Sequence, residues 1–176
     1  MEATKQDKGE AASTASDALA FLEAEHRAVE RLFTAFEKTE DVEAKAAIAQ
    51  RACEELSIHT MLEEELLYPA AQEALPDSDR VDVEEAYIEH FLVKTLIAKF
   101  ETLRAGDRGF DATFKVMSEM VDHHVEEEEQ ELFPELRKSK CNLRELGEKM
   151  AKRKAELQLK LDAVGSRSGG DKTMTL

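Results

Sequence analysis

Apolar residues recur at steps of three and four positions through most of the chain. This step is typical of helices that bury one face. It predicts four helices, over residues 17–39, 41–73, 80–105 and 110–137, and a weaker fifth helix over 142–163. Ser16 or Asp17 is suited to the N-cap of the first helix. Only seven glycines and three prolines interrupt these patterns, so we expect a helical protein.

The breaks between the four stronger helices are short, which determines how the helices run. "PDSD" follows the second helix and "AGDRG" follows the third. Short links make consecutive helices antiparallel, so we expect an all-α, up-down-up-down four-helix bundle with an additional C-terminal helix. The bundle domain spans residues 17–138, and the C-terminal helix lies in residues 139–164. The polar ends, residues 1–16 and 165–176, are predicted to be disordered.

Charge is distributed unevenly between the bundle and the C-terminal segment. The chain has 24 basic and 39 acidic residues and a net charge of −15, which argues against nucleic-acid binding because phosphate contacts need a basic surface. From residue 137 onwards, however, there are 11 basic and 5 acidic residues. We expect this basic helix to dock on the acidic bundle; self-association or a protein partner is the alternative. Its apolar side comprises Leu143, Leu146, Met150, Leu157 and Leu161.

The cysteines and the apolar runs of the sequence indicate in which cellular compartment we expect the protein. Cys53 and Cys141 have no CxxC spacing, so the sequence implies neither a disulfide framework nor a zinc ribbon, and a reducing cytosol fits. The first 16 residues lack the apolar core of a signal peptide, and no apolar run approaches the roughly 20 residues of a membrane span. We therefore expect a cytoplasmic protein that contacts no membrane.

The two halves of the predicted bundle repeat each other. "HTMLEEELLYP" at residues 59–69 returns as "HVEEEEQELFP" at residues 124–134. His59, Glu63 and Pro69 are each followed 65 positions later by the same residue type, and His26 is followed by His90 after 64 positions. The first two helices therefore look like a copy of the next two. The apolar stripe of the second helix comprises Ala52, Leu56, His59, Glu63, Leu66 and Ala70.

The repeat places six polar side chains in the bundle interior at similar depth: His26, His59, Glu63, His90, His124 and Glu128. A single such histidine is more often a hydrogen-bonded core residue than a ligand. Two buried carboxylates, however, are costly without a partner or a metal, and no basic residue on the stripes neutralises them. A histidine and a glutamate four residues apart can reach one metal, and the carboxylate can bridge to a second. Nitrogen and oxygen ligands suit iron, with manganese or zinc as weaker options.

The ordered set of His26, His59-x3-Glu63, His90 and His124-x3-Glu128, followed in each half by "LYP" or "LFP", resembles the hemerythrin-like (HHE cation-binding) family. The resemblance covers residues 17–138. It implies a four-helix bundle around two iron ions, a non-haem di-iron centre with a bridging oxo or hydroxo group, which reacts with O2, hydrogen peroxide or nitric oxide. The two glutamates would bridge the irons, and each iron would take two histidines. A ferritin-like site needs two Glu-x-x-His motifs, and the sequence has only Glu23-x-x-His26.

Two positions depart from the oxygen-carrying members of this family. Lys94 stands where they have a fifth histidine, and Glu129 stands where they usually have an aspartate. Without the fifth histidine, each iron would have about five ligands and an open position, which favours redox turnover over O2 storage. The resemblance therefore implies a catalase-like or peroxide-reducing activity, as in peroxide detoxification. Iron, O2 or nitric-oxide sensing or storage is the alternative, and reversible O2 carriage is the weakest.

Several neighbours of the predicted site have both a structural and a functional interpretation. Glu64 and Glu129 would support the ligands from outside, or Glu129 would itself act as the second bridge. Lys94 would lie at the edge of the core, or pair with a ligating glutamate or donate to bound peroxide. Tyr87 would pack, or donate its hydroxyl proton to an oxygen ligand. His123 lies about 100° off the apolar stripe, so we expect it to face solvent or to contact a ligand residue.

Overall fold

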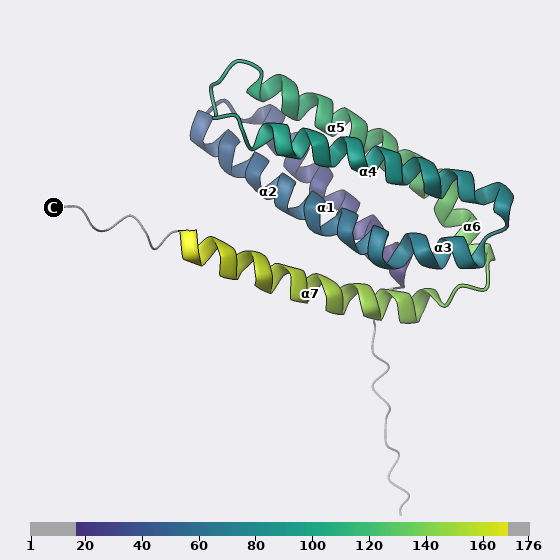
Figure 1. The fold of residues 1–176 in the computed structure, drawn as a ribbon. Coiled ribbons are helices and arrows are strands. Elements are labelled where there is room, and N and C mark those ends of the chain that lie inside the picture. Colours follow the sequence, from purple (N-terminus) through teal and green to yellow (C-terminus); the bar gives the residue numbers. More distant parts are fainter. Residues whose placement is uncertain (1–16, 169–176) are drawn as a thin grey trace, which may run out of the picture.

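The computed structural model describes residues 17–168 as a chain of helices (Figure 1). The long α-helices are α1 Ala18–Lys38, α2 Val42–Leu62, α4 Arg80–Phe100, α5 Phe110–Glu127 and α7 Leu143–Ser168. Two π-helical turns, η1 Glu63–Leu67 and η3 Glu128–Leu132, continue α2 and α5 into the short helices α3 Tyr68–Ala74 and α6 Phe133–Lys138. A 3-10 turn, η2 Asp77–Asp79, precedes α4. The predicted segment 1–16 and residues 169–176 of the predicted tail lie outside the described residues, and α7 extends past its expected end at residue 163.

Local signals account for where the helices begin and end. The Asp17 carboxylate accepts a hydrogen bond from the backbone N–H of Ala20, as the predicted N-cap should, and Asp41 caps α2 in the same way. Between α4 and α5, Gly106 and Gly109 have φ angles of 88° and 91°, which favour glycine. α4 ends at Phe100, before the predicted residue 105, where the backbone N–H groups of Thr102 and Leu103 donate to the carbonyl oxygens of Lys99 and Phe100 in tight turns.

The helices form the predicted up-down-up-down bundle (Figure 1). α1 contacts α2, α4 contacts α5, and the two pairs meet where α1 touches α5 and α2 touches α4. The predicted all-α fold class is confirmed. Among residues 17–168, no helix is long and apolar enough to cross a membrane.

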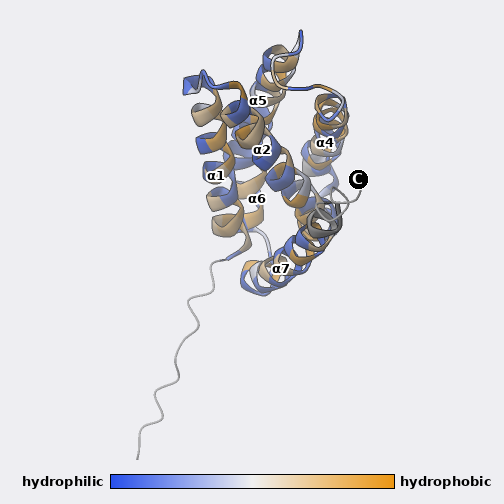
Figure 2. Cartoon of the chain, turned by 90° about the vertical axis from the view of Figure 1, so that its left-hand side faces the viewer, coloured by the Kyte–Doolittle hydropathy of each residue, from blue (hydrophilic) through white to orange (hydrophobic). Residues whose placement is uncertain are grey.

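The C-terminal helix α7 lies along the outside of the bundle, against α1 and α2 (Figure 1). Leu146, Met150 and Leu157 are buried in this contact, so the basic helix docks on the acidic body as its charge predicts. Leu161 is 41% exposed. Its assignment to the docking side is wrong because the apolar contact of α7 ends at Leu157. Figure 2 shows that α7, like the bundle helices, carries hydrophilic and hydrophobic residues on different sides.

Each π-helical turn is closed by a hydrogen bond that spans five residues. The backbone N–H of Tyr68 donates to the carbonyl oxygen of Glu63, and that of Phe133 donates to the carbonyl oxygen of Glu128. The two prolines of the repeat follow directly, within the first turn of α3 and of α6. Proline has no N–H to donate, and each proline falls where the backbone passes from the π turn back into an α-helix. The helices therefore continue through both prolines.

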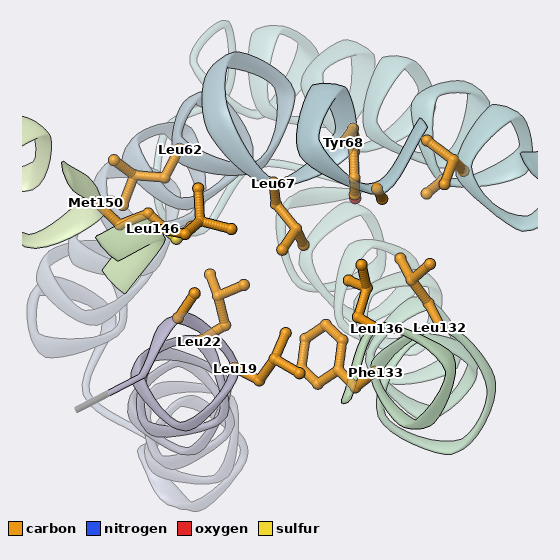
Figure 3. Close-up of a cluster of buried hydrophobic side chains, with 14 of the residues drawn as sticks. Leu19, Leu22, Leu62, Leu67, Tyr68, Leu132, Phe133, Leu136, Leu146 and Met150 are labelled. Atoms are coloured by element: carbon orange, nitrogen blue, oxygen red, sulfur yellow. The ribbon is translucent and has the colours of Figure 1, made fainter. Parts of the chain in front are cut away.

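The first π turn also changes which residues face the core. One extra residue in a turn rotates everything that follows by about 100°. As a result Leu67, Tyr68 and Ala71 are fully buried, and Figure 3 shows Leu67 and Tyr68 pointing into the apolar cluster. The predicted stripe continued instead through Leu66 and Ala70, which are only half buried. That part of the prediction is wrong because it assumed an unbroken α-helical period.

The core consists of two apolar clusters with a polar layer between them. The first lies near α3, α6 and α7 and includes Leu22, Leu62, Leu132 and Met150 (Figure 3). The second lies toward the α4–α5 turn and is rich in aromatic rings, among them Phe33, Phe36, Phe100, Phe110 and Phe114. Burial of these apolar side chains holds the helices in place around the polar layer.

Candidate metal centre

The polar layer contains all six sequence-predicted ligands, one histidine from each long bundle helix and one glutamate from each π turn. His26 comes from α1, His59 from α2, His90 from α4 and His124 from α5, while each glutamate is the first residue of a π turn. All six are at most 4% exposed. We call this set the ligand layer: His26, His59, Glu63, His90, His124 and Glu128.

The ligand layer divides into two overlapping groups. One is formed by His26, His59, Glu63 and Glu128 and the other by Glu63, His90 and His124; within each group the ligand atoms lie within 4.8 Å of one another. Oε1 of Glu63 is 3.2 Å from Nε2 of His59, and its Oε2 is 3.2 Å from Nε2 of His90. Oε2 of Glu128 is 3.6 Å from Nε2 of both His26 and His124. Each carboxylate therefore lies between imidazoles of both halves, where a bridging ligand would be.

Three carboxylate oxygens in this layer, both of Glu63 and Oε2 of Glu128, are buried and accept no hydrogen bond from a described residue. A buried carboxylate oxygen without a partner is costly. Cations held between these oxygens would offset that cost. Imidazole nitrogens and carboxylate oxygens are also a donor set that suits iron. The residues present therefore fit a pair of metal ions.

The titratable groups of the ligand layer influence one another strongly. Burial alone would raise the pKa of Glu63, but the neighbouring imidazoles, His59 foremost, lower it well below its usual range. Burial and the charge of Glu63 raise the pKa of Glu128. Burial would lower the pKa of His124, but nearby carboxylates, Glu128 foremost, raise it to about 9. Without metal the layer retains protons, and a cation that binds there must displace them.

Carboxylates outside the layer contact the far ring nitrogen of three of the four imidazoles. The Nδ1 atoms of His26, His90 and His124 lie 2.8, 3.0 and 2.7 Å from carboxylate oxygens of Glu129, Glu64 and Glu89, respectively. Such contacts orient an imidazole and leave its Nε2 free to bind a metal. The positions of Glu64 and Glu129 agree with the predicted supporting role, and it is Glu128 rather than Glu129 that lies within the layer. Glu89 was missed in the sequence, although it directly precedes a predicted ligand.

Tyr68 is a second residue that sequence reasoning missed. Its hydroxyl donates to Oε1 of Glu128 at 2.9 Å and lies 3.0 Å from Nε2 of His90. Burial, together with the charge of Glu128, raises the pKa of Tyr68, so the phenol keeps its proton. Its counterpart in the repeat, Phe133, stacks on His26 with ring centroids 6.0 Å apart and has no hydroxyl. The difference between "LYP" and "LFP" was the available signal.

Lys94 contacts a supporting carboxylate rather than a predicted ligand. Its ammonium nitrogen lies 2.5 and 2.6 Å from the two carboxylate oxygens of Glu64, and its side chain is 43% exposed. This agrees with the predicted position at the edge of the core. Tyr87 packs edge-on against Tyr68, and its hydroxyl is 3.5 Å from the carbonyl oxygen of Glu64. His123 is 63% exposed and pairs with a surface glutamate.

Comparison with known proteins places this geometry in a family. A family model described as the hemerythrin HHE cation binding domain matches residues 17–136. The chain belongs to this HHE family. Members are described as cation-binding domains, which agrees with a ligand layer that suits metal ions.

Two relatives of this HHE domain are informative. An uncharacterised hemerythrin-like protein of Schizosaccharomyces pombe is 26% identical over 114 residues, a match that covers 65% of this chain but only 56% of that protein. The crystal structure of a hemerythrin HHE cation-binding domain-containing protein from Mycobacterium kansasii has a similar fold, with a TM-score of 0.68 and 24% identity. That likeness covers 81% of this chain and 87% of the other.

The HHE domain has a small cavity on the aromatic-cluster side of the imidazoles. The four histidines of the ligand layer form one wall, and the remaining wall is mostly aliphatic, with Val29, Val93, Val121 and Val125. It has room for about one water-sized molecule. The surface that faces this space is apolar.

An acidic groove reaches the ligand layer of the HHE domain from the outside. It runs between α4 and the α5–η3 segment and ends at His124 and Glu128. Its other polar lining consists of Asp82, Glu85, Glu89, Glu127 and Glu131. On the side of α1 and α2, α7 packs against the bundle instead.

Proposed function

We propose that the chain binds two iron ions in the ligand layer and that the loaded protein consumes hydrogen peroxide. His26, His59, Glu63 and Glu128 would hold one ion, and His90, His124 and the same two glutamates would hold the other. In dismutation, two molecules of hydrogen peroxide give one O2 and two water molecules, so one peroxide is oxidised, the other is reduced and no outside reductant is needed.

The observation that carries the proposal is the position of Glu63. Its two carboxylate oxygens lie 3.2 Å from imidazoles of different halves, and neither accepts a hydrogen bond from a described residue. A structural glutamate in a bundle core would be expected to have its oxygens satisfied by donors. Two oxygens that face separate imidazole pairs instead suit a carboxylate that joins two ions.

The open positions of the proposed centre favour chemistry over simple storage. Lys94, at the position of the fifth histidine of oxygen carriers, is held outside by Glu64. The protein would thus supply two imidazoles and shared carboxylates to each ion, fewer than six ligands. Bound iron would supply the one-electron and oxygen chemistry that amino-acid side chains lack.

The chain's own residues would prepare the site. The contacts of Glu64, Glu89 and Glu129 with Nδ1 atoms orient three imidazoles. Tyr68 holds a proton at Oη, next to Glu128, where it can be donated to an oxygen atom. The valine-lined cavity beside the imidazoles has room for about one water-sized molecule and therefore excludes bulk water. The two free cysteines are in keeping with a reducing cytosol as the setting.

Metal content and peroxide consumption test the proposal together. We expect the chain, purified without added metal, to contain about two irons and to remove hydrogen peroxide faster than the same amount of free iron. His124→Ala should lose iron and activity, whereas its exposed neighbour His123→Ala should retain both. Zinc alone, no metal, or peroxide loss no faster than with free iron would overturn the proposal.

A second candidate function is a sensor that reports through α7. The observation that favours it is the ion pair between Lys154 of α7 and Glu25, the residue before His26. Metal or gas binding would then change how tightly α7 docks. Hydrogen exchange of residues 142–163 should slow or accelerate when iron or nitric oxide is added. Identical exchange in all states would remove this candidate.

A further inference from the structure

The repeat predicts a fourth contact to the imidazoles that the structure does not contain. Glu64 and Glu129 are 65 positions apart and contact the equivalent histidines of the two halves. Glu89 contacts Nδ1 of His124, and the residue 64 positions before it is Glu25. By the repeat, Glu25 should therefore contact Nδ1 of His59.

Glu25 instead contacts the C-terminal helix. Its Oε2 lies 2.6 Å from Nζ of Lys154, which is also 3.3 Å from Oε2 of Glu55. Nδ1 of His59 is buried and has no hydrogen-bond partner among residues 17–168. The side chains of Glu25 and Lys154 are only 15% and 23% exposed, so water screens their attraction less than that of a surface pair.

At the equivalent carboxylate of the other half, Glu89, residues 17–168 supply no lysine or arginine partner. Glu89 lines the open acidic groove, and its ion-pair partner among the described residues is His124. The counterpart of Glu55 in the repeat is Met120, so the second carboxylate is missing there as well. The two halves thus differ at this contact because α7 covers one of them (Figure 1).

We propose that Lys154 is a positioning residue that keeps Glu25 away from His59, so that the two metal positions of the proposed centre bind with different strength. A carboxylate on the far nitrogen makes an imidazole a stronger ligand, and such partners typically change metal affinity about 10- to 100-fold. The position with His90 and His124 has this support on both imidazoles. The position with His26 and His59 has it on His26 alone, and it gains the second support only when Lys154 releases Glu25. The inference rests on the proposed function, since it concerns the same two ions.

Matched variants of the two equivalent glutamates test the first part of the inference. Zinc is the probe, and its two stepwise dissociation constants are measured on the full chain by competition with a chelating indicator. Glu89→Ala should weaken one constant about 10- to 100-fold, because His124 loses its partner. Glu25→Ala should change neither constant more than about threefold, because Glu25 does not support His59. Equal losses in both variants would overturn the inference.

Lys154→Gln tests the second part, with Arg153→Gln as its control on the same helix. Arg153 pairs with Glu65 and has no contact with Glu25 among those the structure shows. We expect Lys154→Gln to tighten the weaker zinc constant about tenfold and to give His59 a hydrogen-bonded, slowly exchanging Nδ1 proton in imidazole NMR spectra. Arg153→Gln and the charge-conserving Lys154→Arg should resemble the wild type. Adding Glu25→Ala to Lys154→Gln should cancel the gain.

The outcomes separate this inference from the proposed function. In Lys154→Gln, the weaker zinc constant should tighten only because Glu25 is released. If it still tightens when Glu25→Ala is added, or if Arg153→Gln tightens it equally, α7 affects zinc binding by a route that does not involve Glu25. A wild-type chain that binds fewer than two zinc ions would contradict the two-metal centre. The NMR spectra of the metal-free proteins would still show whether Lys154 controls the contact between Glu25 and His59.

Discussion

Tyr68→Phe removes the hydroxyl that contacts Glu128 of the ligand layer and leaves the ring in place. The Tyr68 hydroxyl donates to Oε1 of Glu128 at 2.9 Å, and the Glu128 side chain is 3% exposed. The other oxygen of this carboxylate already accepts no hydrogen bond from a described residue, so the variant leaves both without one. A hydrogen bond to a charged group contributes about 1.5–3 kcal/mol. At about 2–4 °C per kcal/mol for a chain of this size, the metal-free protein should melt about 3–12 °C lower.

Urea unfolding of the chelator-treated protein at pH 8, followed by far-ultraviolet circular dichroism, measures this loss. The midpoint should fall with an unchanged slope, because the buried area stays the same. Tyr87→Phe is the matched control, since its hydroxyl makes only a 3.5 Å contact with a backbone carbonyl, at the limit of a hydrogen bond. The reasoning about Glu128 would be refuted if the two variants lost the same stability.

Three further predictions concern the second cluster, the α4–α5 turn and the cysteines. Phe114→Ala should lower the free energy of unfolding by about 3–5 kcal/mol, because Phe114 is 1% exposed and contacts three other rings; a loss below about 1 kcal/mol in urea melts would contradict its burial. Gly109→Ala should cost about 1–2 kcal/mol through its positive φ alone, since an added Cβ meets no atom within 4 Å; unchanged thermal stability would argue against that turn. A thiol reagent at pH 8 should label Cys141 well before Cys53, because burial and the charges of Glu101 and Glu54 raise the pKa of the Cys53 thiol to about 12; equal labelling rates would disagree with this.

Helical periodicity and the repeat were enough to predict the bundle and to select the six residues of the ligand layer. The α-helical period predicted the wrong core positions where the backbone leaves the α-helix. The π turn at Glu63 adds a residue that no apolar step reveals, so Tyr68 enters the core and the stripe shifts off Leu66. The early end of α4 depends on backbone turns at residues 99–103 rather than on apolar residues. Whether Glu25 contacts His59 or Lys154 depends on where α7 packs on the bundle. Neither the helical period nor the repeat predicts that position.

The internal repeat has a consequence for the origin of this chain. One half supplies a lone histidine and a His-x3-Glu pair, and each group of the ligand layer includes residues from both halves. One half supplies at most three ligands of either group, and two identical halves related by a twofold axis would supply the same ligands to both. A half-length helical hairpin that dimerised around metal is therefore the simplest ancestor. Duplication and fusion of its gene would have freed the copies to diverge, into Tyr68 in one and Phe133 in the other, without losing the ligands they share.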